Sequence, residues 1–141
     1  MDQLAIAAEV DEFLATHTRT MLVTLRTDGS PTIHPMVGLW RDDALWFNAY
    51  RKSVKTRNIE RDPRVCCLVL GGDDDLVPPA IVVHGRAELL PPGTIMPGTD
   101  GSAPAAPAGV SGGMVRKVAS RLETNKRGLF RVVPDRVELL A

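Results

Sequence analysis

The feature that most constrains this chain is a series of short apolar or β-branched runs separated by turn residues. Residues 21–26 (MLVTLR) and 32–40 (TIHPMVGLW) flank the pair Asp28-Gly29, and residues 44–49 (ALWFNA) follow the polar triplet at 41–43. Asp-Gly between such runs is a strong hairpin signal, because the tight turn needs positive φ angles that these residues tolerate. The pattern therefore predicts three consecutive antiparallel strands.

Further runs of the same kind extend the sheet. Residues 64–70 (RVCCLVL) predict a fourth strand and residues 81–90 (IVVHGRAELL) a fifth, in which Gly85 indicates a bulge or a close backbone approach. At the end of the chain, residues 129–133 and 136–140 predict a hairpin turned at Pro134-Asp135. Six short strands with few helices predict a mainly β fold, a small antiparallel barrel that removes its exposed edges by closing on itself.

Helical periodicity is confined to two longer segments. Apolar residues at helical spacing predict an amphipathic helix in the first fifteen residues, and a second helix is predicted over residues 115–126. Between strands and second helix, residues 91–113 are dominated by Pro, Gly, Ala and Ser, which predicts a mobile loop, either a lid over a binding groove or a tolerated insertion. The length of 141 residues suits one domain, residues 1–141.

A third, shorter helix is indicated by SVKTRNIERDPR, which begins at Ser53. Ser53 can cap the backbone N–H of Thr56, and Pro63 disfavours helical geometry at the residue before it, so about two turns are expected. Lys55 and Arg57 lie at the positive end of the helix dipole, where a bound anion would favour them. Free N–H groups, two hydroxyls and a lysine in one turn are typical of a phosphate site; the alternative is a solvated helix face.

Charge and composition restrict the partners. Lys+Arg and Asp+Glu both number 17, so no overall positive field attracts nucleic acid or an anionic membrane. The N-terminus MDQLAIAAEVDEF carries acids where a signal peptide carries bases, and no apolar run approaches the roughly 18 residues of a membrane span, so a cytoplasmic protein is expected. The three histidines show no metal-ligand spacing, and adjacent Cys66 and Cys67 are expected to be reduced and on opposite faces of a strand.

The order of these segments resembles a known superfamily. A strand, the DGSP turn, two further strands and then KTRNIERDPRVCCLVL, followed by IVVHGRAEL and FRVVPDRVEL, are similar to the pyridoxamine 5'-phosphate oxidase-like split-barrel proteins that bind flavins. Within that superfamily, the chain looks most like the actinobacterial flavin- and deazaflavin-dependent oxidoreductases. The resemblance covers nearly all of the chain except residues 91–113, and it implies a homodimer of split barrels with cofactor in grooves between the subunits.

The resemblance also implies the site residues. It places the cofactor phosphate near Lys55, and ring contacts on the strand after the DGSP turn and on the strand that follows it. The residues implied for cofactor binding are Ser53, Lys55, Thr56, Arg57 and Asn58 for the phosphate, and Thr32, His34, Pro35, Met36, Phe47 and Asn48 for the ring. The cofactor is expected to be the deazaflavin coenzyme F420 or FMN, with F420 slightly favoured. No catalytic side chain is assigned, because such a cofactor carries the hydride chemistry itself.

The expected function is that of an oxidoreductase that transfers hydride to or from a small organic substrate. FRVVPDRVELLA lacks the arginine and histidine pattern that true pyridoxamine phosphate oxidases carry near the C-terminus, so that reaction is not expected. One alternative is a non-catalytic protein that carries or senses a flavin, F420 or haem. Another is an oligonucleotide-binding barrel that uses the basic helix at 116–126, against which the neutral charge and few aromatics argue.

Overall fold

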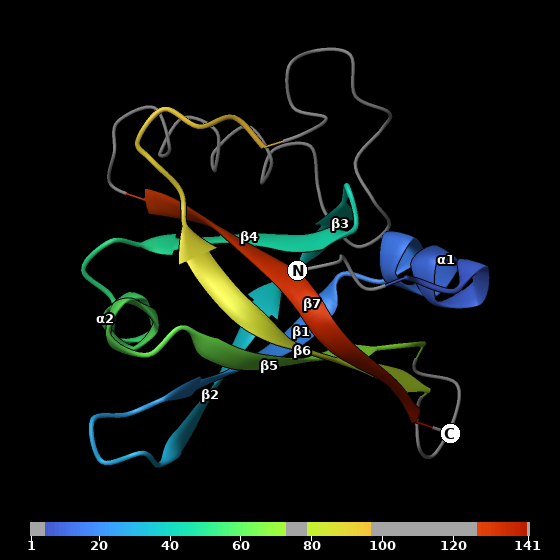
Figure 1. Ribbon diagram of the computed structural model, residues 1–141, viewed down its shortest axis with the longest axis horizontal. Helices are drawn as coiled ribbons and strands as arrows, with labels where there is room; N and C mark the ends of the chain where they lie inside the picture. Colours follow the sequence, from blue (N-terminus) through green and yellow to red (C-terminus); the bar gives the residue numbers. More distant parts are fainter. Residues whose placement is uncertain (1–4, 73–78, 97–126, 141) are drawn as a thin grey trace.

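The computed structural model describes residues 5–72, 79–96 and 127–140. Within these residues seven strands form one antiparallel sheet, in the order β2-β1-β5-β6-β7-β4-β3, accompanied by two helices (Figure 1). The elements, in chain order, are α1 (Ala8–Thr16), β1 (Arg19–Leu25), β2 (Pro31–Val37), β3 (Leu39–Arg41), β4 (Ala44–Tyr50), α2 (Val54–Arg61), β5 (Arg64–Leu70), β6 (Ala80–Leu89) and β7 (Arg127–Leu140). The predicted mainly β, antiparallel class is confirmed, with seven strands rather than six.

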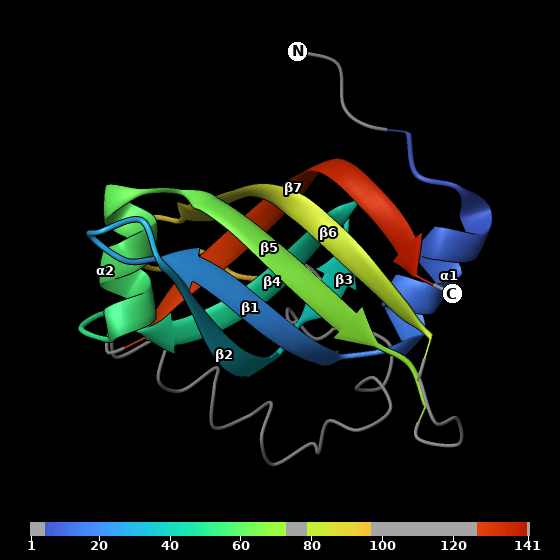
Figure 2. The ribbon, with the colours of Figure 1, turned by 90° about the horizontal axis from the view of Figure 1, so that it is seen from below.

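The sheet is strongly curled into a half-barrel, and its concave face holds the core (Figure 2). Alternate residues of β1 and β5 are buried, as the period of two in their sequences predicts. On β4 and β7, the rings of Phe47 and Phe130 stack at 5.4 Å between centroids. Cys66 and Cys67 are free thiols on opposite faces of β5, as expected, and burial raises the pKa of Cys67 to about 12.

The run at 32–40 is not one strand, which corrects the sequence prediction. β2 pairs with β1, whereas β3 pairs with β4, and the chain changes partner at Gly38 between them. A Cβ at Gly38 would lie 2.7 Å from Thr20 Oγ1 and 3.1 Å from Leu45 Cδ1. Only glycine allows the backbone to pass this close to the core, so the break in the strand is fixed by one residue within an otherwise continuous apolar run.

The predicted C-terminal hairpin is also wrong, because residues 127–140 form the single long strand β7. Asp135 is an extra residue in the β6–β7 ladder, where His84 is opposite Arg136 and Gly85 is opposite Pro134. A bulge accommodates a proline, which lacks the N–H for a regular ladder, so Pro134-Asp135 bends the strand without reversing it. The prediction of a bulge or close approach at Gly85 is confirmed, since a Cβ there would lie 2.4 Å from Val133 O.

The helices lie at opposite ends of the sheet (Figure 1, Figure 2). In α1, Leu14 is 1% exposed and inserts into the core, as the helical period predicts. The indole Nε1 of Trp40 on β3 donates a 2.7 Å hydrogen bond to Asp11 Oδ1, which attaches α1 to that strand. α2 begins after Ser53 and ends before Pro63, as predicted, so the chain between β4 and β5 is held as two short helical turns.

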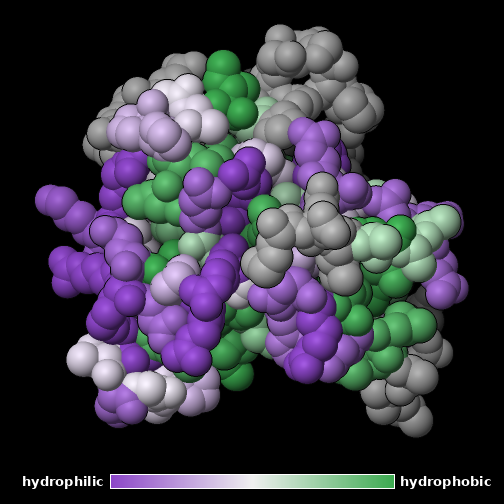
Figure 3. Space-filling view, in the orientation of Figure 1, coloured by the Kyte–Doolittle hydropathy of each residue, from purple (hydrophilic) through white to green (hydrophobic). Residues whose placement is uncertain are grey.

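Two sequence predictions fall largely outside the described residues. Residues 91–96 form a turn that buries Met96, whereas residues 97–113 of the predicted loop and the predicted helix at 115–126 are not described. In the described part of the chain, no helix has the length and apolarity needed to cross a bilayer. Hydrophilic side chains cover much of the outer face of β6 and β7, where Arg131 pairs with Glu88 at 2.7 Å (Figure 3).

Candidate functional site

The beginning of α2 forms a compact, capped turn. Ser53 Oγ accepts a hydrogen bond from Thr56 N–H at 3.3 Å, and Thr56 Oγ1 donates to Tyr50 O at 2.7 Å. The first helical hydrogen bond runs from Arg57 N–H to Ser53 O, so the amides of Val54 and Lys55 precede it. The predicted N-cap is confirmed, and the amides of Val54 and Lys55 lie at the positive end of the helix dipole.

A chain of polar contacts connects α2 to the β1–β2 hairpin. Asn58 Nδ2 donates to Thr24 Oγ1 on β1 at 3.0 Å, and Thr24 Oγ1 lies 2.8 Å from Thr32 Oγ1 on β2. Thr32 Oγ1 in turn lies 3.0 Å from His34 Nε2. Asn58, Thr24 and Thr32 are buried, whereas His34 is half-buried. The structure thus brings together three of the sequence-predicted residues, Asn58, Thr32 and His34, in one hydrogen-bonded chain.

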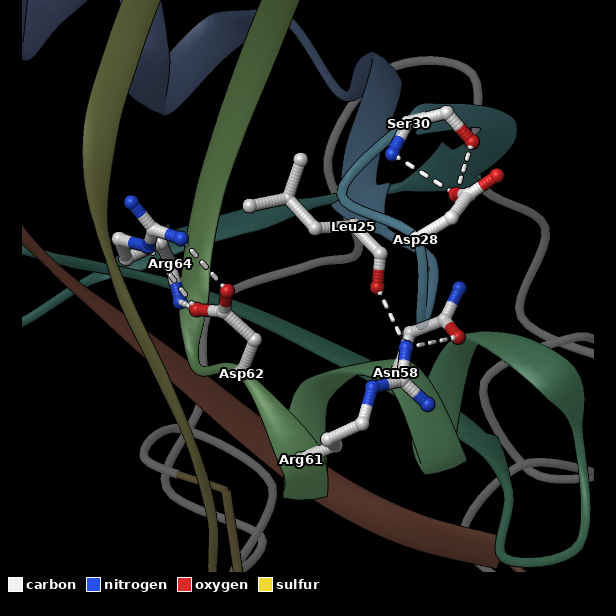
Figure 4. A network of polar contacts seen from close by, with 7 residues as sticks. All are labelled: Leu25, Asp28, Ser30, Asn58, Arg61, Asp62 and Arg64. Atoms are coloured by element: carbon white, nitrogen blue, oxygen red, sulfur yellow. Dashed lines mark hydrogen bonds and ion pairs between the residues drawn. The ribbon is translucent and has the colours of Figure 1, made fainter.

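Arg61, at the end of α2, holds the other side of this chain. Its Nη2 donates both to Leu25 O at 2.7 Å and to Asn58 Oδ1 at 2.9 Å, which joins the helix to β1 (Figure 4). On the far side of Arg61, Asp62 and Arg64 form a separate ion pair of 2.7 Å. The amide of Asn58 is therefore fixed between a guanidinium and a hydroxyl.

Two cations, Lys55 and Arg26, act on His34, which is the more exposed end of this series of hydrogen bonds. Partial burial lowers the pKa of His34, and the charges of Lys55 and then Arg26 lower it further. The imidazole is consequently neutral at neutral pH, and the lysine whose charge acts on it is half-buried in the first turn of α2. The site combines a helix N-terminus, one lysine and one neutral histidine, which suits an anionic ligand with further polar atoms.

The other predicted residues are less closely grouped. Met36 shares the face of His34 on β2 and packs against the core, whereas Pro35 is exposed on the opposite face. Phe47 is 3% exposed within the core, and Asn48 points to the opposite side of β4, where Arg127 Nη1 donates to its Oδ1. Arg57 is exposed on α2. Of the predicted residues, the structure joins Asn58, Thr32 and His34 by hydrogen bonds and places Lys55 where its charge acts on His34, whereas Phe47 is a core residue.

Sequence reasoning missed two residues that organise the site, Thr24 and Arg61. Thr24 carried a signal: it occupies an inward position of MLVTLR, next to Leu22 on the buried face, where a polar residue needs a partner. Arg61 carried a weaker signal: Asn58 lies three residues before it on the same helix, but its second partner is a carbonyl of β1 that lies 36 residues earlier in the chain.

Fold and site together define an antiparallel half-barrel with a positively charged polar site where α2 meets the β1–β2 hairpin. The chain belongs to the pyridoxamine 5'-phosphate oxidase family, whose model matches residues 6–101. This confirms the superfamily that the sequence resembles. A search of curated proteins found no match.

Solved structures support the same fold. A conserved hypothetical protein from Mycobacterium tuberculosis is 25% identical with a TM-score of 0.70, over 98% of this chain and 86% of the other. A protein described as an F420 reductase is 21% identical with a TM-score of 0.63, over 94% and 98% of the two chains. A FAD-binding protein from Mesorhizobium loti is 20% identical with a TM-score of 0.63, over 96% and 92%. Proteins of this fold thus include some whose descriptions name a flavin-type cofactor.

Proposed function

We propose that this protein is an oxidoreductase that binds a phosphorylated flavin-type cofactor, F420 or FMN, and transfers hydride to or from a small organic substrate. The observation that carries the proposal is the capped N-terminus of α2, whose Lys55 is close enough for its charge to lower the pKa of His34 on β2. The fold neighbours described as an F420 reductase and a FAD-binding protein support the cofactor class. When bound, such a cofactor supplies the hydride acceptor or donor.

The donors at the start of α2 fit a phosphate group. The amides of Val54 and Lys55 precede the first helical hydrogen bond, and the Lys55 ammonium adds a charge on the same turn. The first turn contains no acidic residue that would compete with an anion. Ser53 and Thr56 support this turn through their hydrogen bonds to each other and to the Tyr50 carbonyl, rather than adding free donors.

The ring of the cofactor would lie over β2, next to His34 and Met36. We further propose that a second copy of the chain completes the groove. Three large apolar side chains on or beside the site elements are well exposed, namely Ile33 at 62%, Tyr50 at 45% and Val54 at 62%. Exposed apolar side chains of this size are suited to burial against a protein partner. Such an interface would also exclude water from the ring.

The test is a parallel titration of the cofactor-free protein with FMN and with F420, following the fluorescence of each. Wild-type protein should bind one of them at micromolar affinity or better. Lys55→Ala should weaken that binding by roughly 1.5 to 3 kcal/mol, about 10- to 150-fold, because a charge-assisted hydrogen bond is lost. Arg136→Ala is the matched control, since Arg136 is an exposed cation near the C-terminal end of β7. That end of the strand lies away from α2 (Figure 1).

Two results would redirect the proposal. Equal affinities of wild-type protein and the Lys55→Ala variant would remove the phosphate from the α2 N-terminus. Tight binding of a cofactor that no reductant or substrate ever reduces or oxidises would favour a non-catalytic carrier or sensor. A haem-type ligand would be the next to test if neither FMN nor F420 binds.

A further inference from the structure

The hydrogen-bonded chain from Arg61 to His34 has a direction, which follows from the chemistry of its ends. An arginine side chain can only donate hydrogen bonds, so the atom of Asn58 that meets Arg61 Nη2 at 2.9 Å must be the amide oxygen. The amide nitrogen of Asn58 therefore faces β1. It must donate to Thr24 Oγ1, at 3.0 Å.

The next two contacts are between hydroxyls, and either oxygen could donate in isolation. Thr24 is 0% exposed, and the only other partner of its Oγ1 within the described residues is Thr32 Oγ1 at 2.8 Å. If Thr32 donated to Thr24, the proton of Thr24 would be buried without an acceptor, which costs about 1–3 kcal/mol. Thr24 therefore donates to Thr32.

Because Thr32 has a single hydroxyl proton and accepts from Thr24, that proton is free to go to His34. The acceptor is Nε2, 3.0 Å away. An imidazole nitrogen that accepts a hydrogen bond carries no proton, so the proton of the neutral ring is on Nδ1. Nδ1 has no hydrogen-bond partner in the described part of the protein, and the ring is half-buried, so this nitrogen is open to a ligand.

We propose that Asn58, oriented by Arg61, is a positioning residue that fixes His34 in the Nδ1–H tautomer through Thr24 and Thr32. Asn58, which the family resemblance offers as a cofactor contact, is 4% exposed and acts through this chain instead. The open nitrogen of His34 is then a hydrogen-bond donor, and it selects a ligand with an acceptor there, such as a carbonyl oxygen or an unprotonated ring nitrogen. The ligand assignment rests on the proposed function, whereas the tautomer does not.

The tautomer is measured directly in ligand-free protein by two-dimensional ¹H–¹⁵N spectroscopy of the imidazoles. The chain has three histidines, and His34→Gln assigns the signal of interest by its loss. Spectra are recorded at about pH 8, above the usual histidine pKa of about 6.5, so that the rings are neutral. Wild-type His34 should show a protonated Nδ1 and an unprotonated Nε2. A protonated Nε2 in wild-type protein would overturn the proposal.

Asn58→Asp gives the sharpest variant, because a carboxylate can only accept. Thr24 would then donate to the new carboxylate, Thr32 to Thr24, and His34 to Thr32 through Nε2, so the tautomer should invert. Asn48→Asp is the matched control, since Asn48 lies on β4, accepts a hydrogen bond from Arg127 of β7 and is not part of this hydrogen-bonded chain. An unchanged His34 tautomer in Asn58→Asp would contradict the proposal, as would inversion in Asn48→Asp.

Two further measurements keep the test independent of how well Asn58→Asp folds. Thr32→Val removes the donor to Nε2 without changing charge, so the Nδ1–H tautomer should no longer be exclusive; an unaltered tautomer would count against the chain. Saturation of wild-type protein with FMN or F420, whichever binds, should shift the Nδ1–H resonance. An unmoved resonance at saturation would refute the ligand assignment, and failure of both cofactors to bind would refute only the proposed function.

Discussion

His34 makes the stability of the protein depend on pH in a defined direction. Its pKa in the folded protein is lowered by burial and by the nearby charges of Lys55 and Arg26, relative to the ordinary value of 6.5. The contribution of His34 to the free energy of unfolding is fully present above the pKa that this residue has in the unfolded chain. It is lost as the pH falls through the pKa of the folded protein, because the unfolded chain takes up the proton more readily. His34→Gln should therefore lose less unfolding free energy than wild type between about pH 7 and 5. If urea unfolding shows the same loss of unfolding free energy with falling pH for both proteins, the lowered pKa of His34 would be contradicted.

Gly85 is the residue at which the close approach of β6 and β7 is most exacting. A Cβ there would meet the Val133 carbonyl oxygen at 2.4 Å and Val132 Cγ1 at 3.1 Å, and a carbonyl in a ladder cannot move aside cheaply. Gly85→Ala should lower the free energy of unfolding by about 1–3 kcal/mol, the usual cost of overpacking. Gly72→Ala, where a Cβ meets nothing within 4 Å, is the control. Equal urea midpoints for the two variants would show that β6 and β7 can accommodate a methyl group at Gly85 without loss of stability.

The role of a single residue could be predicted from the sequence where the group that it contacts lies a few residues away. Gly85 could be predicted, because glycine inside an apolar strand already indicates a close approach. Ser53 could be predicted as a cap, because Thr56 is three residues away. Thr24 could not be assigned its partner, because Asn58 lies 34 residues further along the chain. Arg61 could not be assigned its role, because only the folded sheet brings the Leu25 carbonyl near it, although Asn58 is one helical turn away.

At the scale of elements, two substitutions of Ser53 at the start of α2 distinguish its role in helix capping from the proposed binding of a phosphate. Ser53→Ala removes the side-chain cap and should cost about 1 kcal/mol of unfolding free energy. Ser53→Asp should retain most of the stability, because aspartate also caps, yet it places a negative charge where the phosphate is proposed to bind. Thermal unfolding and cofactor titration of both variants check this. An aspartate variant that binds cofactor as well as wild type would place the phosphate elsewhere.

The strands were predictable where local pattern and pairing agree. The Asp28-Gly29 turn and the alternation in β1 and β5 identify strands without knowledge of their neighbours. The division at Gly38 and the continuity of β7 through Pro134 were not predictable, because each depends on which strand lies alongside. A Pro-Asp pair indicates a turn in isolation, but β6 pairs with β7 on both sides of Pro134, from Phe130 to Leu140.

At the scale of the whole molecule, the proposed groove requires two copies of the chain. Ile33 on the outer face of β2 and Val54 at the start of α2 are exposed, and an interface that covers them would be stabilised by their burial. Sedimentation equilibrium at micromolar concentration should therefore give twice the chain mass of 15.3 kDa. A monomer that still binds cofactor tightly would show that one chain forms the whole site. The family resemblance implies the second copy, but no periodicity in the sequence does, because an interface has no period of its own.

The most direct test of the phosphate site compares each cofactor with its phosphate-free form in wild-type protein. FMN is titrated against riboflavin, and F420 against the same deazaflavin without its phosphate-bearing tail. One phosphorylated form should bind at micromolar affinity or better, and its phosphate-free counterpart at least about tenfold more weakly, since each 1.4 kcal/mol is a factor of ten. Equal binding of the two forms, or no binding of either phosphorylated cofactor, would contradict a phosphate held at the start of α2.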